Sequence, residues 1–192
     1  MKKTWIAILS IVAVLLIWGT TTYNRLVRQQ EAVTKAWSQV ENVCQRRADL
    51  VPNLVALVKN YAEYEQGTIL AVTEARAKAA STAVNMEKYT ESDLQDFNAT
   101  QQALGQSMNR LLVAVENYPD LKASDKYLTL QAQLAGCERR ILTERGRFNE
   151  AAKAYNQSVR RFPSSLIAKL FGFEKRPYFE ADAGAEKVPE TF

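Results

Sequence analysis

Apolar residues recur along most of the chain at alternating three- and four-residue steps, which is the spacing of one face of an α-helix. After the first two dozen residues, this pattern divides into four stretches. The first two stretches have the apolar members Leu26, Val33, Trp37, Val40 and Cys44, then Leu54, Val58, Tyr61, Ile69, Val72 and Ala75. The last two have Leu94, Phe97, Leu104, Met108, Leu111 and Val115, then Tyr127, Leu134, Ile141, Phe148, Ala152, Tyr155 and Phe162. The pattern therefore predicts four amphipathic helices.

Local signals mark where the last two helices begin and end. Thr90-Glu91-Ser92-Asp93 has the composition of a helix N-cap, in which the Thr90 hydroxyl binds free backbone amides. The fourth helix is predicted to begin near Ser124, after YPDLKAS, and to stop at Pro163. The four helices are of similar length, about 25 to 38 residues, so residues 24–163 are predicted to form an up-and-down antiparallel four-helix bundle.

The stretch QRRADLVPNLV, residues 45–55, interrupts the pattern and has two interpretations. Asp49 is a good N-cap residue and Pro52 would lie in the first turn after it, which favours a turn between the first two helices. However, the apolar spacing continues through Cys44, Val51 and Val58, as it would in one long helix kinked at Pro52. The turn is the favoured prediction, and the long helix stays open.

The N-terminal segment carries a long uncharged run, TWIAILSIVAVLLIWGTTTYN, over residues 4–24. As a helix this run is about 31 Å long, the thickness of a bilayer core. Trp5, Trp18 and Tyr23 lie towards its ends, where aromatic rings prefer the lipid headgroups. The alternative is a cleaved signal peptide, but no A-x-A pattern or lipobox cysteine follows. Residues 1–23 are therefore predicted to form an uncleaved transmembrane anchor.

The basic residues that flank this anchor bear on its orientation in the membrane. The compact basic start at Lys2 and Lys3 is typical of an export signal and favours a bundle on the periplasmic or extracellular side. Arg25, Arg28 and Lys35 flank the other end, so the cytoplasmic side stays open.

The amino-acid composition excludes several classes of catalytic and binding site. The 192 residues include 7 Gly, 5 Pro and no His, and carry a formal charge of +4. Without histidine, Ser/His/Asp triads, Cys/His dyads and histidine zinc sites cannot form within one chain. The sequence also lacks a Gly-rich phosphate loop and a nucleic-acid motif. It predicts an all-α protein that is not an enzyme and that uses no cofactor, metal or nucleic acid.

Residues 164–192 are predicted to form a short amphipathic helix followed by a tail. If the fourth helix returns antiparallel to the first, this segment arrives beside the membrane, where an apolar face with basic neighbours suits the lipid interface. The candidate membrane contacts are Arg160, Arg161, Leu166, Ile167, Lys169, Leu170, Phe171 and Phe173. The alternative is that the apolar members cap the open end of the bundle core. In the tail, Tyr178 and Phe179 are candidates for a small docking plug.

Arg46, Arg47 and Asp49 are candidate contacts for an anion or a protein partner. Arg47 occupies a core-type position in the apolar spacing, which is unusual for an arginine. The favoured interpretation is structural, with the guanidinium bound to a carboxylate or to backbone carbonyls at helix ends. The fourth helix carries a polar stripe that is expected to fix packing register rather than perform chemistry, and its members are Glu138, Arg145, Asn149 and Asn156.

Several stretches together resemble the LemA family of bacterial membrane proteins. They are YNRLV, AWSQVE, QRRADLVPNLV, VTEARAKA, ENYPDLKA, LAGCERRI, RRFPSSLIAKLFGF and PYFEADAGAEKVP, in the family's order from residue 23 onward. The resemblance implies an N-terminal membrane anchor followed by a four-helix bundle, and it supplies no catalytic residue. It also implies two possible settings, magnetosome membrane formation and envelope quality control beside membrane proteases.

Taken together, the sequence predicts a non-enzymatic, single-pass scaffold or adaptor of the bacterial envelope. Its expected partners are the lipid bilayer, a second copy of the chain and another membrane protein whose identity the sequence does not give. The alternatives are a homo-oligomeric membrane-remodelling protein and an accessory factor to a membrane protease.

Overall fold

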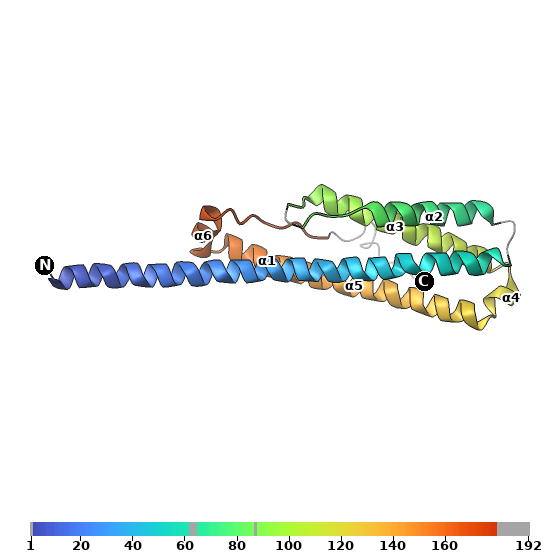
Figure 1. Ribbon diagram of the computed structural model, residues 1–192, viewed down its shortest axis with the longest axis horizontal. Coiled ribbons are helices and arrows are strands. Elements are labelled where there is room, and N and C mark those ends of the chain that lie inside the picture. Colours follow the sequence, from blue (N-terminus) through green and yellow to red (C-terminus); the bar gives the residue numbers. More distant parts are fainter. Residues whose placement is uncertain (1, 62–64, 87, 180–192) are drawn as a thin grey trace, which may run out of the picture. The chain divides into compact units, whose positions relative to one another are not determined.

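The computed structural model describes residues 2–61, 65–86 and 88–179, and these residues form six helices and no strand (Figure 1). The helices are α1 (Lys2–Lys59), α2 (Gln66–Ser81), α3 (Glu91–Val115), α4 (Pro119–Lys122), α5 (Asp125–Arg160) and α6 (Ser164–Leu170). The predicted all-α class, with a long apolar N-terminal helix and packed helices behind it, is confirmed.

The predicted turn at residues 49–52 is wrong, because α1 continues through it to Lys59 with Pro52 inside the helix. Proline has no N–H, so the carbonyl of Ala48, four residues earlier, loses its helical donor. The Nε of Arg76 in α2 supplies a replacement hydrogen bond to this carbonyl at 3.0 Å. Asp49 is not an N-cap and instead accepts a hydrogen bond from Gln45 within α1. The second predicted helix is therefore split between the end of α1 and α2.

We expect Arg76→Ala to lower the free energy of unfolding by about 1–3 kcal/mol, because the buried Ala48 carbonyl is left without its donor. In a Pro52→Ala background the same substitution is expected to cost less than half as much, since the alanine introduced there would donate its own backbone N–H. The free energies of unfolding of the parent chain, the two single variants and the double variant are measured in urea with the full chain in mild detergent, using circular dichroism as the signal. An equal cost in both backgrounds would refute this role for Arg76.

The described residues form two compact units. Residues up to Cys44 pack with Cys137–Arg176 as unit 1, and Gln45–Gly136 pack with residues 177–179 as unit 2. In unit 1, α1 and α5 are joined by buried side chains, among them Trp37 and Phe148, whose ring centroids lie 5.6 Å apart edge to face. In unit 2, α2 and α3 pack on each other, and Val72, Leu104 and Leu111 are fully buried. Both cysteines, Cys44 and Cys137, are buried as thiols.

The predicted N-cap of the third helix is confirmed as a capping box at the start of α3. The Thr90 hydroxyl accepts from the backbone N–H of Asp93, and the Asp93 carboxylate accepts from the backbone N–H of Thr90. These hydrogen bonds lower the pKa of the Asp93 carboxyl. The break predicted at YPDLKAS is confirmed as well, since α4 lies between α3 and α5.

Part of the tail docks on unit 2, as the sequence predicted for Phe179. Its ring is buried, with its centroid 6.5 Å from that of Phe97, and the Tyr89 hydroxyl donates to the carbonyl of Pro177 at 3.5 Å. Tyr178, the other expected member of the plug, is exposed. The remainder of the predicted tail, residues 180–192, lies outside the described residues.

Candidate membrane-contact site

The first part of α1, residues 5–17, is a largely apolar stretch whose side chains are all exposed, and we call it the apolar rod. The side chains of residues 3–17 are exposed on every face of the helix, and the helix is long and apolar enough to cross a membrane. The first buried residues of α1 are Thr22 and Leu26. Packing in unit 1 thus begins where the uncharged run ends, close to the predicted boundary at residue 23.

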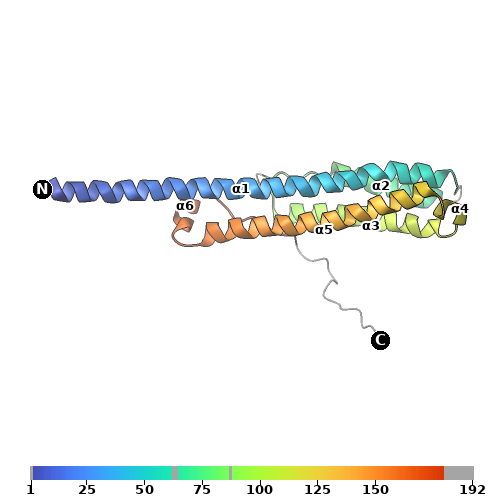
Figure 2. The ribbon, with the colours of Figure 1, turned by 90° about the horizontal axis from the view of Figure 1, so that it is seen from below.

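Helix α6 lies beside α1 at the end of this rod, as Figures 1 and 2 both show. A Cβ atom added to Gly19 would lie 3.8 Å from Cδ1 of Ile167. The ring of Tyr23 packs edge to face against Phe171 and Phe173, with centroid distances of 4.8 and 5.6 Å. Within unit 1 the chain thus returns to the end of the apolar rod, whereas the four-helix bundle stays a prediction.

Local hydrogen bonds fix where α6 begins and ends. At its start, the buried Ser164 hydroxyl lies 2.6 Å from the carbonyl of Ser158 and 2.8 Å from that of Arg161. At its end, Gly172 takes a positive φ of 72° and the Phe173 N–H donates to the carbonyl of Ala168. This is a Schellman ending, in which glycine avoids the strain of the left-handed conformation. It places Phe171 and Phe173 on either side of Gly172, where both reach Tyr23.

The segment after α6 is tied back to α5 by a side-chain amide. Asn156 donates from Nδ2 to the carbonyl of Arg176 at 2.7 Å and accepts from the Arg176 N–H at 2.8 Å. Both groups of this buried side chain are thus satisfied, which agrees with the register role predicted for the polar stripe. Burial raises the pKa of the neighbouring Tyr155 hydroxyl, and the positive charge of Arg176 offsets part of that rise.

Four large apolar side chains at α6 remain exposed, and we call them the exposed apolar patch. They are Phe162 (76% exposed), Leu166 (57%), Leu170 (75%) and Phe171 (56%). The opposite side of α6 is buried through Ser164 and Ala168. Exposed apolar side chains gathered in this way remain a candidate contact surface.

The two interpretations of this segment apply to different residues. Ile167 and Phe173 are half-buried and pack against α1, whereas Leu166, Leu170 and Phe171 belong to the exposed patch. The basic neighbours Arg160, Arg161 and Lys169 are all exposed.

Phe162 was predicted on the buried stripe of the fourth helix, and that prediction is wrong. α5 ends at Arg160, so the helical spacing no longer decides which way residue 162 points. The signal that could have identified it is Pro163, which follows it directly.

The structure brings only part of the Arg46, Arg47 and Asp49 set to the surface. Arg46 and Asp49 are exposed, whereas Arg47 is buried in unit 2. Its Nη2 donates to the backbone carbonyl of Gln101 at 2.9 Å and to the side-chain Oε1 of Gln101 at 2.7 Å. An added Cβ at Gly105 would lie 3.6 Å from its Nη1. The guanidinium therefore binds the middle of α3, rather than the helix end that the sequence suggested.

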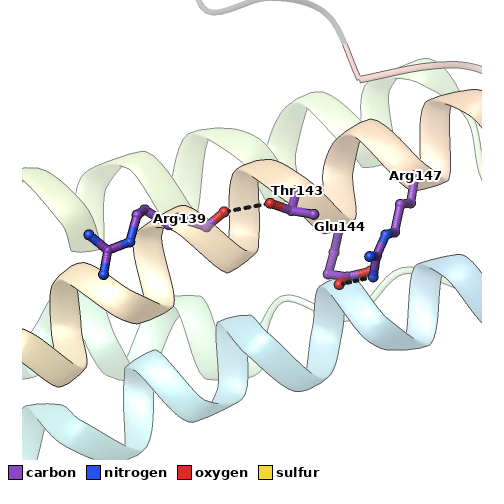
Figure 3. A network of polar contacts seen from close by, with 4 residues as sticks. All are labelled: Arg139, Thr143, Glu144 and Arg147. Atoms are coloured by element: carbon purple, nitrogen blue, oxygen red, sulfur yellow. Dashed lines mark hydrogen bonds and ion pairs between the residues drawn. The ribbon is translucent and has the colours of Figure 1, made fainter.

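Two polar contacts on the surface of α5 in unit 1 are local to the helix. Figure 3 shows Arg147 reaching back to the carboxylate of Glu144 at 2.7 Å, while the Thr143 hydroxyl donates to the carbonyl of Arg139 at 3.0 Å. All of these partners lie three or four residues apart on one helix, so the contacts support α5 rather than form a reaction centre.

Unit 2 contains an open groove that the sequence did not predict. It has a volume of about 530 Å³ and lies between the end of α1, at Asn53, Leu57 and Asn60, and the start of α5, at Asp125 and Thr129. Asp125 and Lys126 are the ionisable side chains of its lining. Within the described residues, no three His, Cys, Asp or Glu side chains are placed to hold a metal ion.

Among the described residues, the apolar rod and the contact of α6 at its end belong to an all-α protein with one candidate membrane-spanning helix. The chain belongs to the LemA family, whose model matches residues 36–192.

Relatives of known name are similar over most of the chain. The magnetosome protein MamQ 2 of Paramagnetospirillum magneticum is 28% identical over 207 aligned positions, which cover 97% of this chain and 76% of the relative. The magnetosome protein MamQ of Magnetospirillum gryphiswaldense is 28% identical, over 88% of this chain and 70% of the relative. Protein LemA of Metamycoplasma hominis is 23% identical, over 82% and 68%.

Proposed function

We propose that the protein is a non-enzymatic scaffold or adaptor of the bacterial envelope, anchored by α1 in the cytoplasmic membrane. The observation that carries this proposal is the change in the surroundings of α1 along one unbroken helix. Residues 5–17 are apolar apart from Ser10 and have side chains exposed on every face, and from Thr22 onward the same helix is packed. Exposed apolar surface of this length is stable in lipid and unfavourable in water.

The position of α6 supports anchoring at this depth. Its neighbour Gly19 lies five residues before the end of the uncharged run, which corresponds to about 7 Å along the helix axis. Amphipathic helices that lie in the plane of a membrane enter the boundary between headgroups and acyl chains by about 5–10 Å. The exposed apolar patch is thus at the depth that such a helix occupies, and α6 gives the protein a second contact with the bilayer.

The continuous helix suits the role of a scaffold. No loop interrupts α1 before Lys59, so the anchor and the packed residues that follow it belong to one helix to which a partner can bind. Arg46 and Asp49 are exposed on this part of the helix and remain our candidate partner contacts, with Arg47 as the buried residue between them. The side of the membrane that the helical body occupies stays a prediction from the flanking basic residues.

The proposal is tested by expressing the full chain and a chain lacking residues 2–21 in bacteria and separating membranes from soluble protein. The full chain is expected in the membrane fraction, resistant to extraction with carbonate, and its intact mass should include residues 1–22. The shortened chain is expected in the soluble fraction, because the exposed apolar patch alone is too small for stable insertion. If the full chain yielded a mature product that was trimmed before Tyr23 and freely soluble, the proposal would be refuted.

A second candidate function is homo-oligomeric membrane remodelling. Its support is the magnetosome setting that the family resemblance implies, together with the similarity to proteins named as magnetosome proteins in two organisms. Self-association would involve the apolar rod and the surface of α1 that follows it. Mass measurement of the full chain in mild detergent separates the two candidates, since a monomer at all concentrations contradicts an oligomeric coat.

A further inference from the structure

Basic side chains gather at the end of unit 1 that adjoins the apolar rod. We define the anchor-proximal section as residues 22–37 and 148–176, bounded by the contact between Trp37 and Phe148. It contains nine basic and three acidic side chains, a net charge of +6. The rest of the chain holds 16 basic and 18 acidic side chains, a net charge of −2. The positive charge of this protein is therefore concentrated in one section.

These basic side chains are available for binding. Eight of the nine are exposed, and none of the eight forms an ion pair with another of the residues that the structure describes. They are Arg25, Arg28, Lys35, Lys153, Arg160, Arg161, Lys169 and Lys175. By contrast, Arg147 of α5, which lies just outside this section, forms an ion pair with Glu144. A net charge of +6 with few internal partners attracts anions.

The basic side chains also stand next to apolar surface. Arg160 and Arg161 precede Phe162, and Lys169 lies between Ala168 and the exposed Leu170. α6 itself packs against Gly19 and Tyr23, at the end of the apolar rod. A free phosphate ion would use the charges and leave the apolar patch in water. A phospholipid satisfies both, because its headgroup carries the negative charge and its acyl chains cover the apolar side chains.

We infer that the anchor-proximal section is a binding site for anionic phospholipid headgroups, an inference that rests on the proposed membrane anchoring. The exposed apolar patch enters the lipid boundary, and the surrounding basic side chains bind headgroup phosphates. Arginine suits this task, since its planar guanidinium binds two phosphate oxygens at once. The site gives the protein a preference among lipids that an apolar helix alone does not provide.

The test uses the full chain reconstituted in phosphatidylcholine vesicles that contain spin-labelled phosphatidylglycerol or spin-labelled phosphatidylcholine. Electron spin resonance gives the relative association of each lipid with the protein surface. We expect phosphatidylglycerol to associate about two-fold or more strongly, and the preference to fall between about 0.1 and 1 M salt as the Debye length shortens.

Two double variants with the same change of charge locate the headgroup site, and a third tests the apolar patch. Arg160→Gln with Arg161→Gln is expected to remove at least half of the preference. Arg139→Gln with Arg140→Gln removes the same charge from exposed positions on the same helix, outside the section, and is expected to leave the preference unchanged. Leu166→Ser with Leu170→Ser is expected to lower the amount of both bound lipids equally. Circular dichroism confirms that each variant is folded.

The outcomes distinguish a failure of the headgroup site from a failure of the proposed membrane anchoring. Equal association of the two lipids, or equal loss of preference in the two arginine variants, overturns the headgroup site while leaving the anchor in place. A chain that does not remain with the vesicles at all contradicts the proposed function instead. Loss of preference confined to the Arg160 and Arg161 variant supports the site.

Discussion

Trp37→Ala is expected to lower the free energy of unfolding by about 3–5 kcal/mol, the usual cost of truncating a large buried aromatic side chain. The Trp37 side chain is 1% exposed and packs edge to face with Phe148. Its removal leaves a cavity between α1 and α5 in unit 1 and also forfeits the ring contact, which is worth about 0.5–1.5 kcal/mol beyond burial. The effect is measured by urea unfolding of the full chain in mild detergent, with helicity as the signal.

The matched control for this variant is Leu142→Ala. Leu142 is an apolar residue of α5 in the same unit, but its side chain is 65% exposed, so its loss should change stability by no more than about 0.5 kcal/mol. If the two variants were equally stable, the Trp37 contact would not hold α1 to α5. The packed part of unit 1 would then have no fixed position on its anchor helix.

Arg47→Ala is expected to cost about 2–3 kcal/mol. The side chain is buried, and its Nη2 donates to both the carbonyl and the side-chain oxygen of Gln101. Hydrogen bonds to a charged group are worth about 1.5–3 kcal/mol each, and truncation also leaves an empty space beside Gly105, but removal of the buried charge recovers its desolvation cost and offsets part of this loss. Arg47→Lys should recover only part of the loss, because an ammonium group lacks the planar donor arrangement of a guanidinium.

The neighbouring Arg46→Ala is the control, since Arg46 is exposed on the same helix. It should leave the unfolding free energy within about 0.5 kcal/mol of the parent chain. Were Arg47→Ala equally harmless to stability yet damaging to capture of a membrane partner, Arg47 would be a binding residue. That result would contradict the structural role that its contacts with Gln101 indicate.

The residues of the candidate site are partly predictable from the sequence. The four-residue step from Leu166 to Leu170, with basic residues on both sides, is enough to identify one apolar face of a short helix. The sequence does not separate Ile167 and Phe173 from that face. Their half-buried state depends on Gly19 and Tyr23, which belong to the opposite end of the chain.

Local sequence patterns are enough to predict several elements of the structure. The uncharged run, the capping box at Thr90 and the break after Tyr118 depend on residues within a few positions of one another. Backbone geometry and hydrogen bonding at that range are set by residue type, so sequence reasoning predicts all three.

The turn predicted at Asp49 is wrong because the contact that decides the structure there is not local. Asp49 and Pro52 are favourable at a helix start, and no neighbour in sequence supplies a donor for the carbonyl that Pro52 frees. Arg76 supplies it from 28 residues away, and so makes proline tolerable inside a long helix.

The sequence by itself thus determined that this is a helical protein with an apolar N-terminal rod, because helical periodicity and charge-free length are properties of neighbouring residues. Only the tertiary structure decided that α1 is unbroken, that Arg47 is buried, and that α6 lies against the end of the rod with its apolar patch exposed. Each of these depends on contacts between distant segments, whose free energy outweighs the local preference of the residues involved.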